Sequence, residues 1–150
     1  MASIYILGII QDALEPDQFS LDDATQLWGC MLNNICPDNV ELTKIAAKAI
    51  TRLAPGSKQF FEDANLRTAI MEGIFKLLEF QDEEVLQSAL EALIDISQLN
   101  YPLMGEFLPR LLLVTKKLLQ GQTEDVAQFS IEVWTSLLEA ECDNLQNPLE

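Results

Sequence analysis

The residues with the clearest chemical potential in this sequence are carboxylates at helical spacing. Glu91 and Asp95 follow Glu84 by seven and eleven residues, and Glu132 follows Asp125 by seven. Such spacing places the side chains of each set on one face of a helix. A solvated face is the ordinary interpretation, and an acidic strip that receives a basic peptide or helix is the alternative. Paired catalytic carboxylates would need a pocket that separates their pKa values, and the sequence indicates none.

A basic stripe interrupts this acidic pattern. Lys44, Lys48 and Arg52 recur every four residues in an earlier segment. The repeat spacing described below places Lys48 beside Glu91. It likewise places Arg52 beside Asp95, so we expect exposed ion pairs between adjacent helices, each contributing ~0–1 kcal/mol. A patch for phosphate or for an acidic partner is the functional alternative.

The remaining composition argues against catalysis. The 150 residues include no histidine, which excludes Ser-His-Asp and Cys-His catalysis and histidine-ligated zinc. The three cysteines, Cys30, Cys36 and Cys142, form no Cys-x-x-Cys motif and indicate a reducing compartment. The sequence has no glycine-rich phosphate loop and no Asp-x-Asp-x-Asp-Gly metal loop. We therefore expect neither an enzyme nor a cofactor or metal.

Charge and hydropathy restrict the partners. Nine Lys and Arg stand against 24 Asp and Glu, a net charge of −15, whereas nucleic-acid binding depends on clustered cations. Apolar residues make up 49% of the chain, enough to form a packed core. The apolar run from Ile4 to Ile10 is far shorter than the ~20 residues that cross a bilayer. We expect no nucleic-acid partner and no membrane span.

Helices must position these side chains. Apolar residues recur at three- and four-residue steps, and no period-two run indicates a strand. The break at Pro37 ends one helix and supplies Asp38 or Asn39 as the cap of the next. Pro109 either kinks its helix or marks its first turn. The predicted helices cover 4–14, 21–35, 39–54, 64–79, 83–98, 103–119 and 124–141.

Internal repetition organises the helices into pairs. Residues 84–93 align with 125–134 at an offset of 41 residues, and a third segment joins at an offset of 43. Ala46, Ala89 and Ser130 occupy the same place, where a larger side chain would push stacked helices apart. A period of ~40–47 residues with two helices per unit is typical of HEAT and armadillo solenoids. We predict an all-α, right-handed α-α superhelix of about three and a half helix pairs.

The predicted pairs are 21–54, 64–98 and 103–141, each with a first (A) helix and a second (B) helix. Residues 4–14 would then be a B helix without its A partner. The termini, Met1-Ala2-Ser3 and Leu149-Glu150, resemble cloning remnants. We therefore expect residues 1–150 to form a single array that is a piece of a longer protein.

Several segments resemble the importin-β (karyopherin-β) family. The runs Ile9-Ile10-Gln11-Asp12 and Glu15-Pro16-Asp17-Gln18-Phe19 carry part of this resemblance. The run Glu124-Asp125-Val126-Ala127, continued by Ile131-Glu132-Val133-Trp134-Thr135-Ser136, is more specific. The Ala46-Ala47 helix and the Arg67-x-x-Ile70-Met71 helix fall in register between them. The resemblance covers nearly the whole chain and corresponds to the N-terminal third of the family, near the fourth to seventh HEAT repeats.

This resemblance implies a nuclear import receptor of the cytoplasm, the nucleus and the nuclear pore. Such receptors carry basic cargo, often through importin-α, past FG-repeat nucleoporins and release it on contact with Ran GTPase. The family's acidic loop would begin beyond residue 150, so Ran contact is expected of the full-length receptor rather than of this segment. The alternative is a HEAT-repeat scaffold or adaptor subunit unrelated to nuclear transport.

The resemblance also implies site residues, because the family binds nucleoporin phenylalanines between neighbouring A helices. One implied pocket is formed by Trp28, Leu32, Leu66, Ala69 and Ile70, and a second by Phe107 and Val114. Ala69 stands where the family has a large aromatic residue, which implies a shallower first pocket. An acidic concave face for basic cargo is assigned to Glu84, Glu91, Asp95, Asp125 and Glu132.

Overall fold

The computed structural model describes residues 20–146, and every regular element in this range is helical. The α-helices are α2 (Leu21–Leu32), α3 (Val40–Leu53), α4 (Lys58–Phe61), α5 (Ala64–Leu77), α6 (Glu83–Leu99), α7 (Leu108–Gly121) and α8 (Glu124–Gln146). Short 3-10 turns cover Ala54–Gly56, Tyr101–Leu103 and Gly105–Phe107. The all-α prediction is confirmed, and the predicted helix 4–14 lies outside the described residues.

Polar side chains fix where four of these helices begin. Before α2, the Asp23 amide donates to Ser20 Oγ at 3.1 Å and the Ser20 amide donates to Asp23 Oδ2 at 3.3 Å, which forms a capping box. Asn39, Asp63 and Asp82 cap α3, α5 and α6 by accepting from a backbone amide three residues on. Asn39 is thus the cap of α3, and each such cap typically contributes ~1 kcal/mol.

Helix α7 begins five residues later than the predicted start at 103, at Leu108. The 3-10 turn Gly105–Phe107 precedes it, and Pro109 lies in its first turn. Proline is favoured there, because its missing N–H would have no helical partner and its φ is already helical. Pro109 therefore marks the first turn and does not kink the helix, and Phe107 lies before α7.

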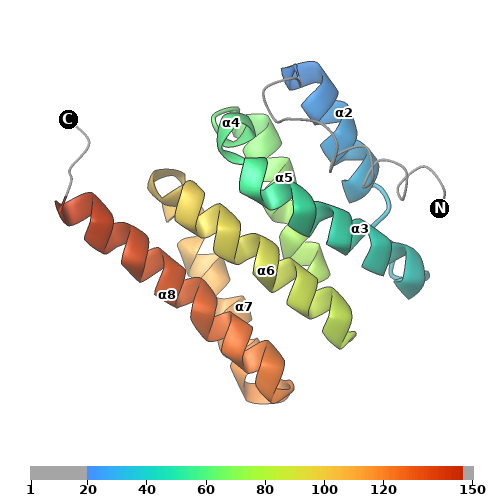
Figure 1. The fold of residues 1–150 in the computed structure, drawn as a ribbon. Coiled ribbons are helices and arrows are strands. Elements are labelled where there is room, and N and C mark those ends of the chain that lie inside the picture. The colour runs from blue at the N-terminus through green and yellow to red at the C-terminus, as the bar shows by residue number, and fades with distance from the viewer. Residues whose placement is uncertain (1–19, 147–150) are drawn as a thin grey trace.

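The helices form two layers. Figure 1 shows the B helices α3, α6 and α8 side by side, with α5 and α7 behind them. α3 packs along α6, and α6 packs along α8. Within the pairs, α2 contacts α3, α5 contacts α6, and α7 contacts α8. This consecutive packing follows the three predicted pairs and is typical of a helical repeat array.

Small side chains lie in the B layer at the predicted positions. Ala46, Ala89 and Ser130 are all fully buried. Near this contact, Thr51 Oγ1 of α3 donates to the Ser88 carbonyl of α6 at 2.7 Å. The layer is therefore held by close helix packing together with a hydrogen bond between adjacent repeats.

Replacement of Ala89 tests the close approach of the B helices. Leucine at this fully buried position is expected to lower the free energy of unfolding by about 1–3 kcal/mol, because the added carbons overpack the contact. Urea denaturation measures the effect. The matched control, Gln98→Leu, changes an exposed residue of the same helix and is expected to shift stability by less than ~0.5 kcal/mol. Equal stability of both variants would contradict close packing at Ala89.

Candidate functional site

An open groove of ≈ 420 Å³ lies between the A helices α2 and α5. Three residues of the first predicted pocket, Leu32, Leu66 and Ala69, line it. The other lining residues are Leu21, Asp22, Thr25, Gly29, Asp63 and Asn65. The structure thus brings part of the predicted pocket together at a surface groove, while binding of a ligand there stays a prediction.

Trp28 and Ile70 lie in the core. Both side chains are 0% exposed, so the prediction that they form an exposed pocket wall was wrong. α2 contacts both α3 and α5, so apolar residues are buried on two sides of this helix. The indole Nε1 of Trp28 has no hydrogen-bond partner in the described structure. Trp28 therefore acts as an apolar packing residue.

The side chain of Leu32 packs against a glycine of α5. A Cβ atom on Gly73 would lie 2.0 Å from Leu32 Cδ2 and 3.7 Å from Ile35 Cδ1. The absence of a side chain at this position lets Leu32 lie directly against the α5 backbone. Leu32 also lines the groove.

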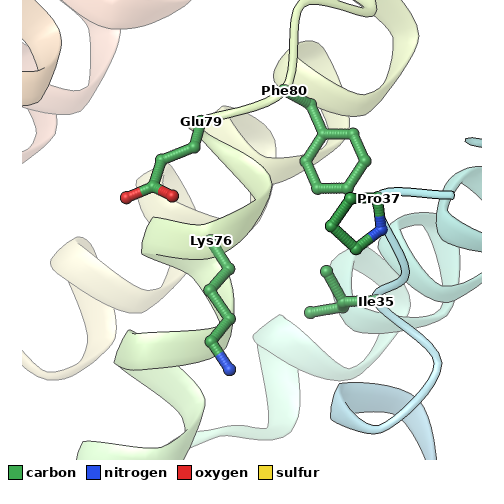
Figure 2. A pocket seen from close by; sticks show the side chains of 5 residues that line it. All are labelled: Ile35, Pro37, Lys76, Glu79 and Phe80. Atoms are coloured by element: carbon green, nitrogen blue, oxygen red, sulfur yellow. The ribbon is translucent and has the colours of Figure 1, made fainter.

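A second pocket, of ≈ 510 Å³, lies at the other end of the α2–α5 seam and was not predicted. Figure 2 shows the apolar side chains of Ile35, Pro37 and Phe80 across from Lys76 and Glu79. The sequence did contain a signal, since Pro37 and Phe80 are related by the 43-residue offset. By itself, the sequence around Pro37 indicates only a helix boundary.

The second predicted pocket does not have the expected wall. Phe107 is only 9% exposed, and Val114 is half-buried and packs against the core. Because α7 starts at Leu108, Phe107 belongs to the preceding turn and packs inward. Its assignment as an exposed pocket ring was therefore wrong.

Where the second pocket was expected, long side chains connect α5 with the start of α7. Arg67 Nε lies 3.2 Å from Glu106 Oε1, and Arg110 Nη1 lies 2.5 Å from Glu72 Oε1. The Arg110 guanidinium also stacks 4.2 Å from the centre of the buried Phe75 ring. This seam is therefore crossed by ion pairs and a cation–π contact.

The five predicted acidic residues lie on α6 and α8. Three are exposed and two are partly buried: Glu84, Glu91 and Asp125 belong to the first group, and Asp95 and Glu132 to the second. Burial raises the pKa of the Asp95 carboxyl. Glu132 accepts a hydrogen bond from Gln128 Nε2 at 3.2 Å. The acids thus share the B layer but differ in their environments.

Ion pairs between α3 and α6 exist, but in a different register from the one predicted. Lys44 Nζ lies 3.3 Å from Asp82 Oδ2 and 3.4 Å from Glu84 Oε2, and Lys48 also pairs with Glu84. Among the described residues Lys48 therefore pairs with Glu84, and the predicted Lys48–Glu91 pair was wrong. The lysines pair with the acidic residues at the N-terminus of α6, and the 43-residue offset therefore predicted the wrong partner for Lys48. The Arg52–Asp95 pair stays a prediction.

These contacts perturb three pKa values. The hydrogen bond with Asp82 is the main cause that raises the pKa of Lys44. Lys48, followed by Lys44, lowers the pKa of Glu84. Burial opposes ionisation of Asp82, but donation from the Val85 amide and from Lys44 outweighs it and lowers its pKa. All three shifts favour the charged forms.

Comparisons with known proteins give one distant relationship. Importin subunit beta-1 of Arabidopsis thaliana is 21% identical over 147 residues, which cover 97% of this chain and 17% of the relative. No protein-family model matches the chain. The similarity extends over nearly the whole chain and supports a family-level relation to importin-β, while this chain spans only 17% of the length of that relative.

Residues 20–146 offer no membrane span and no metal site. No helix in this range is both long and apolar enough to cross a membrane. The same range contains no group of three or more His, Cys, Asp and Glu side chains placed to hold a metal ion.

Substitution of Lys44 tests the ion pairs of the B layer. Lys44→Met is expected to lower the thermal unfolding midpoint at pH 7, because Asp82 loses its cation and Glu84 keeps only Lys48 of its two lysines. Their lowered pKa values give stability that is present above about pH 4 and is lost as the pH falls through those values. The difference from wild type should therefore shrink between pH 7 and pH 2, and also in high salt.

Lys116→Met is the matched control, because Lys116 is exposed and takes part in none of the ion pairs of the described residues. Thermal denaturation of both variants across this pH range measures the effect. A Lys44→Met deficit that is the same at pH 2 and pH 7 would show that the lysine acts through packing alone.

Proposed function

We propose that this chain is part of a karyopherin-like HEAT-repeat scaffold whose α2–α5 surface binds phenylalanine-rich repeats of nucleoporins. The observation that carries the proposal is the open groove between two consecutive A helices, lined by Leu32, Leu66 and Ala69. The distant similarity to importin subunit beta-1 over 97% of the chain supports it.

The groove suits the side chain of a phenylalanine. Leu32 and Leu66 provide apolar surface, and the exposed, small Ala69 leaves space above α5. Burial of one phenyl ring yields only ~1.5–3 kcal/mol. Binding at one groove is therefore weak and readily reversible, and useful affinity comes from several grooves on one receptor that engage one repeat chain.

The B layer suits a partner of opposite charge. Glu91 and Asp125 are exposed on α6 and α8, and the chain carries a net charge of −15. Such a surface attracts a basic cargo segment or the basic part of importin-α and speeds their association. Contact with Ran GTPase is proposed for the full-length receptor, which would move between cytoplasm and nucleus.

The second candidate function is a HEAT-repeat scaffold or adaptor without a role in nuclear transport. The bridged α5–α7 seam favours it, because Arg67 and Arg110 occupy the surface where a second phenylalanine pocket was expected. Both candidates are protein-binding modules rather than enzymes. Binding of a phenylalanine-rich peptide at Ala69 distinguishes them.

Ala69→Glu tests the groove. A carboxylate at this exposed position is expected to weaken binding of a single-phenylalanine repeat peptide at least tenfold, since it fills and charges the apolar groove; tenfold corresponds to about 1.4 kcal/mol. Titration of the labelled peptide followed by NMR or fluorescence anisotropy measures the Kd. Thr68→Glu places the same charge on the neighbouring exposed residue, outside the groove lining.

The expected result is normal peptide binding by Thr68→Glu and loss by Ala69→Glu. Wild-type protein that binds no phenylalanine peptide, or equal binding by both variants, would contradict the groove as the site. The first of these outcomes would favour the scaffold without a transport role.

A further inference from the structure

We propose that the two pockets of the α2–α5 seam form one track, which holds a single extended peptide by two aromatic side chains about six residues apart. This inference rests on the proposed function, and it adds a spacing and a direction to the ligand. The pockets are the groove that Leu32, Leu66 and Ala69 line and the pocket that Ile35, Lys76 and Phe80 line.

The two pockets share one exposed face of α5. Asn65 and Ala69 line the first pocket, and Lys76 and Glu79 line the second. Asn65, Ala69 and Lys76 are separated by four and seven residues, a spacing that keeps side chains on the same side of a helix. Glu79 follows two residues after the end of α5. All four are exposed. A peptide that follows this face of α5 therefore passes both pockets.

Gly73 lies at the junction of the pockets. Leu32 lines the first pocket, Ile35 lines the second, and both side chains lie close to where a Cβ of Gly73 would be. The side chains of Leu32 and Ile35 thus meet the α5 backbone between the two recesses. This arrangement favours a ligand with two separate apolar side chains over one with a continuous apolar strip.

The spacing of the ligand follows from helix geometry. The first pocket centres near Leu66 of α5, and Lys76, Glu79 and Phe80 of the second centre near Leu78, the C-cap of α5. This is a separation of twelve residues, or ~18 Å along the helix axis at ~1.5 Å per residue. An extended peptide advances ~3.3 Å per residue. Two phenylalanines should therefore be separated by about five intervening residues.

The charges of the two pockets give the peptide a direction. Asp22 and Asp63 line the first pocket. Lys76 lines the second and takes part in none of the ion pairs of the described residues. Glu79, on the same wall (Figure 2), can accept from the peptide backbone. The complementary ligand carries a basic residue beside its first phenylalanine and an acidic residue beside its second.

Titration with designed peptides tests the track. The probe peptide has two phenylalanines separated by five Gly and Ser residues, with Lys beside the first ring and Asp beside the second. We expect this peptide to bind at least tenfold tighter than a peptide with one intervening residue and than one whose second phenylalanine is alanine. A peptide of the correct spacing with Lys and Asp exchanged should bind several-fold more weakly.

Two variants locate the contacts. Ala69→Glu and Lys76→Glu should each reduce the affinity for the probe peptide to that for the single-phenylalanine peptide. Both positions are exposed, so the fold should tolerate these changes. Thr68→Glu and Lys58→Glu are exposed charge-matched controls outside both pockets and should retain the spacing preference.

The outcomes separate this inference from the proposed function. Equal affinities for the five-residue and one-residue spacings would overturn the track, while measurable binding of the single-phenylalanine peptide would leave the proposed function standing. Unchanged probe binding by Lys76→Glu would also overturn the track. Failure of every peptide to bind would remove both proposals.

Discussion

The close approach of the B helices is the constraint on which the rest of this structure depends. Ala46, Ala89 and Ser130 are fully buried, and α6 packs along both α3 and α8. Because these helices are drawn together through small side chains, the spacing of the repeats is set in the B layer. The distance between adjacent A helices is then fixed, and only their side chains can fill the space between them. Where those side chains are short, a surface groove remains in the A layer.

The two A-layer seams meet this requirement in different ways. Between α2 and α5, Gly73 admits Leu32 against the helix backbone, and recesses remain at both ends of the seam. Between α5 and α7, Arg67 and Arg110 span the gap. Exposed ion pairs contribute only ~0–1 kcal/mol, but the stacking of Arg110 on Phe75 covers an aromatic ring. The length of a few side chains therefore decides whether a seam presents a groove or a polar bridge.

Sequence reasoning predicted the features that depend on local pattern. The helix pairs and the small residue Ala89 follow from periodicity and the repeat offset, and they appear in the structure. Turn chemistry predicted a cap at Asp38 or Asn39, and the structure has it at Asn39. The lysines of α3 do pair with α6, but the offset missed their partner, Glu84. A fixed sequence offset cannot predict the ion-pair partner of a long, flexible side chain, because such a side chain pairs with the nearest opposite charge. The pocket at Phe80 was missed for a related reason, since it combines residues from two separate connections.

The exposed fraction of a side chain was the least predictable property. In a stacked array it depends on which helices of the neighbouring repeats cover the residue, as well as on the residue itself. Leu90 and Ile131 occupy equivalent positions 41 residues apart, yet Leu90 is 0% exposed and Ile131 is 55% exposed. α8 packs along α6, whereas no later helix of the described residues packs on α8. Trp28 shows the same effect in reverse, since α3 and α5 both contact its helix and leave the indole buried. An aromatic residue of an A helix can therefore be assigned to a binding surface only when both neighbouring repeats have been placed.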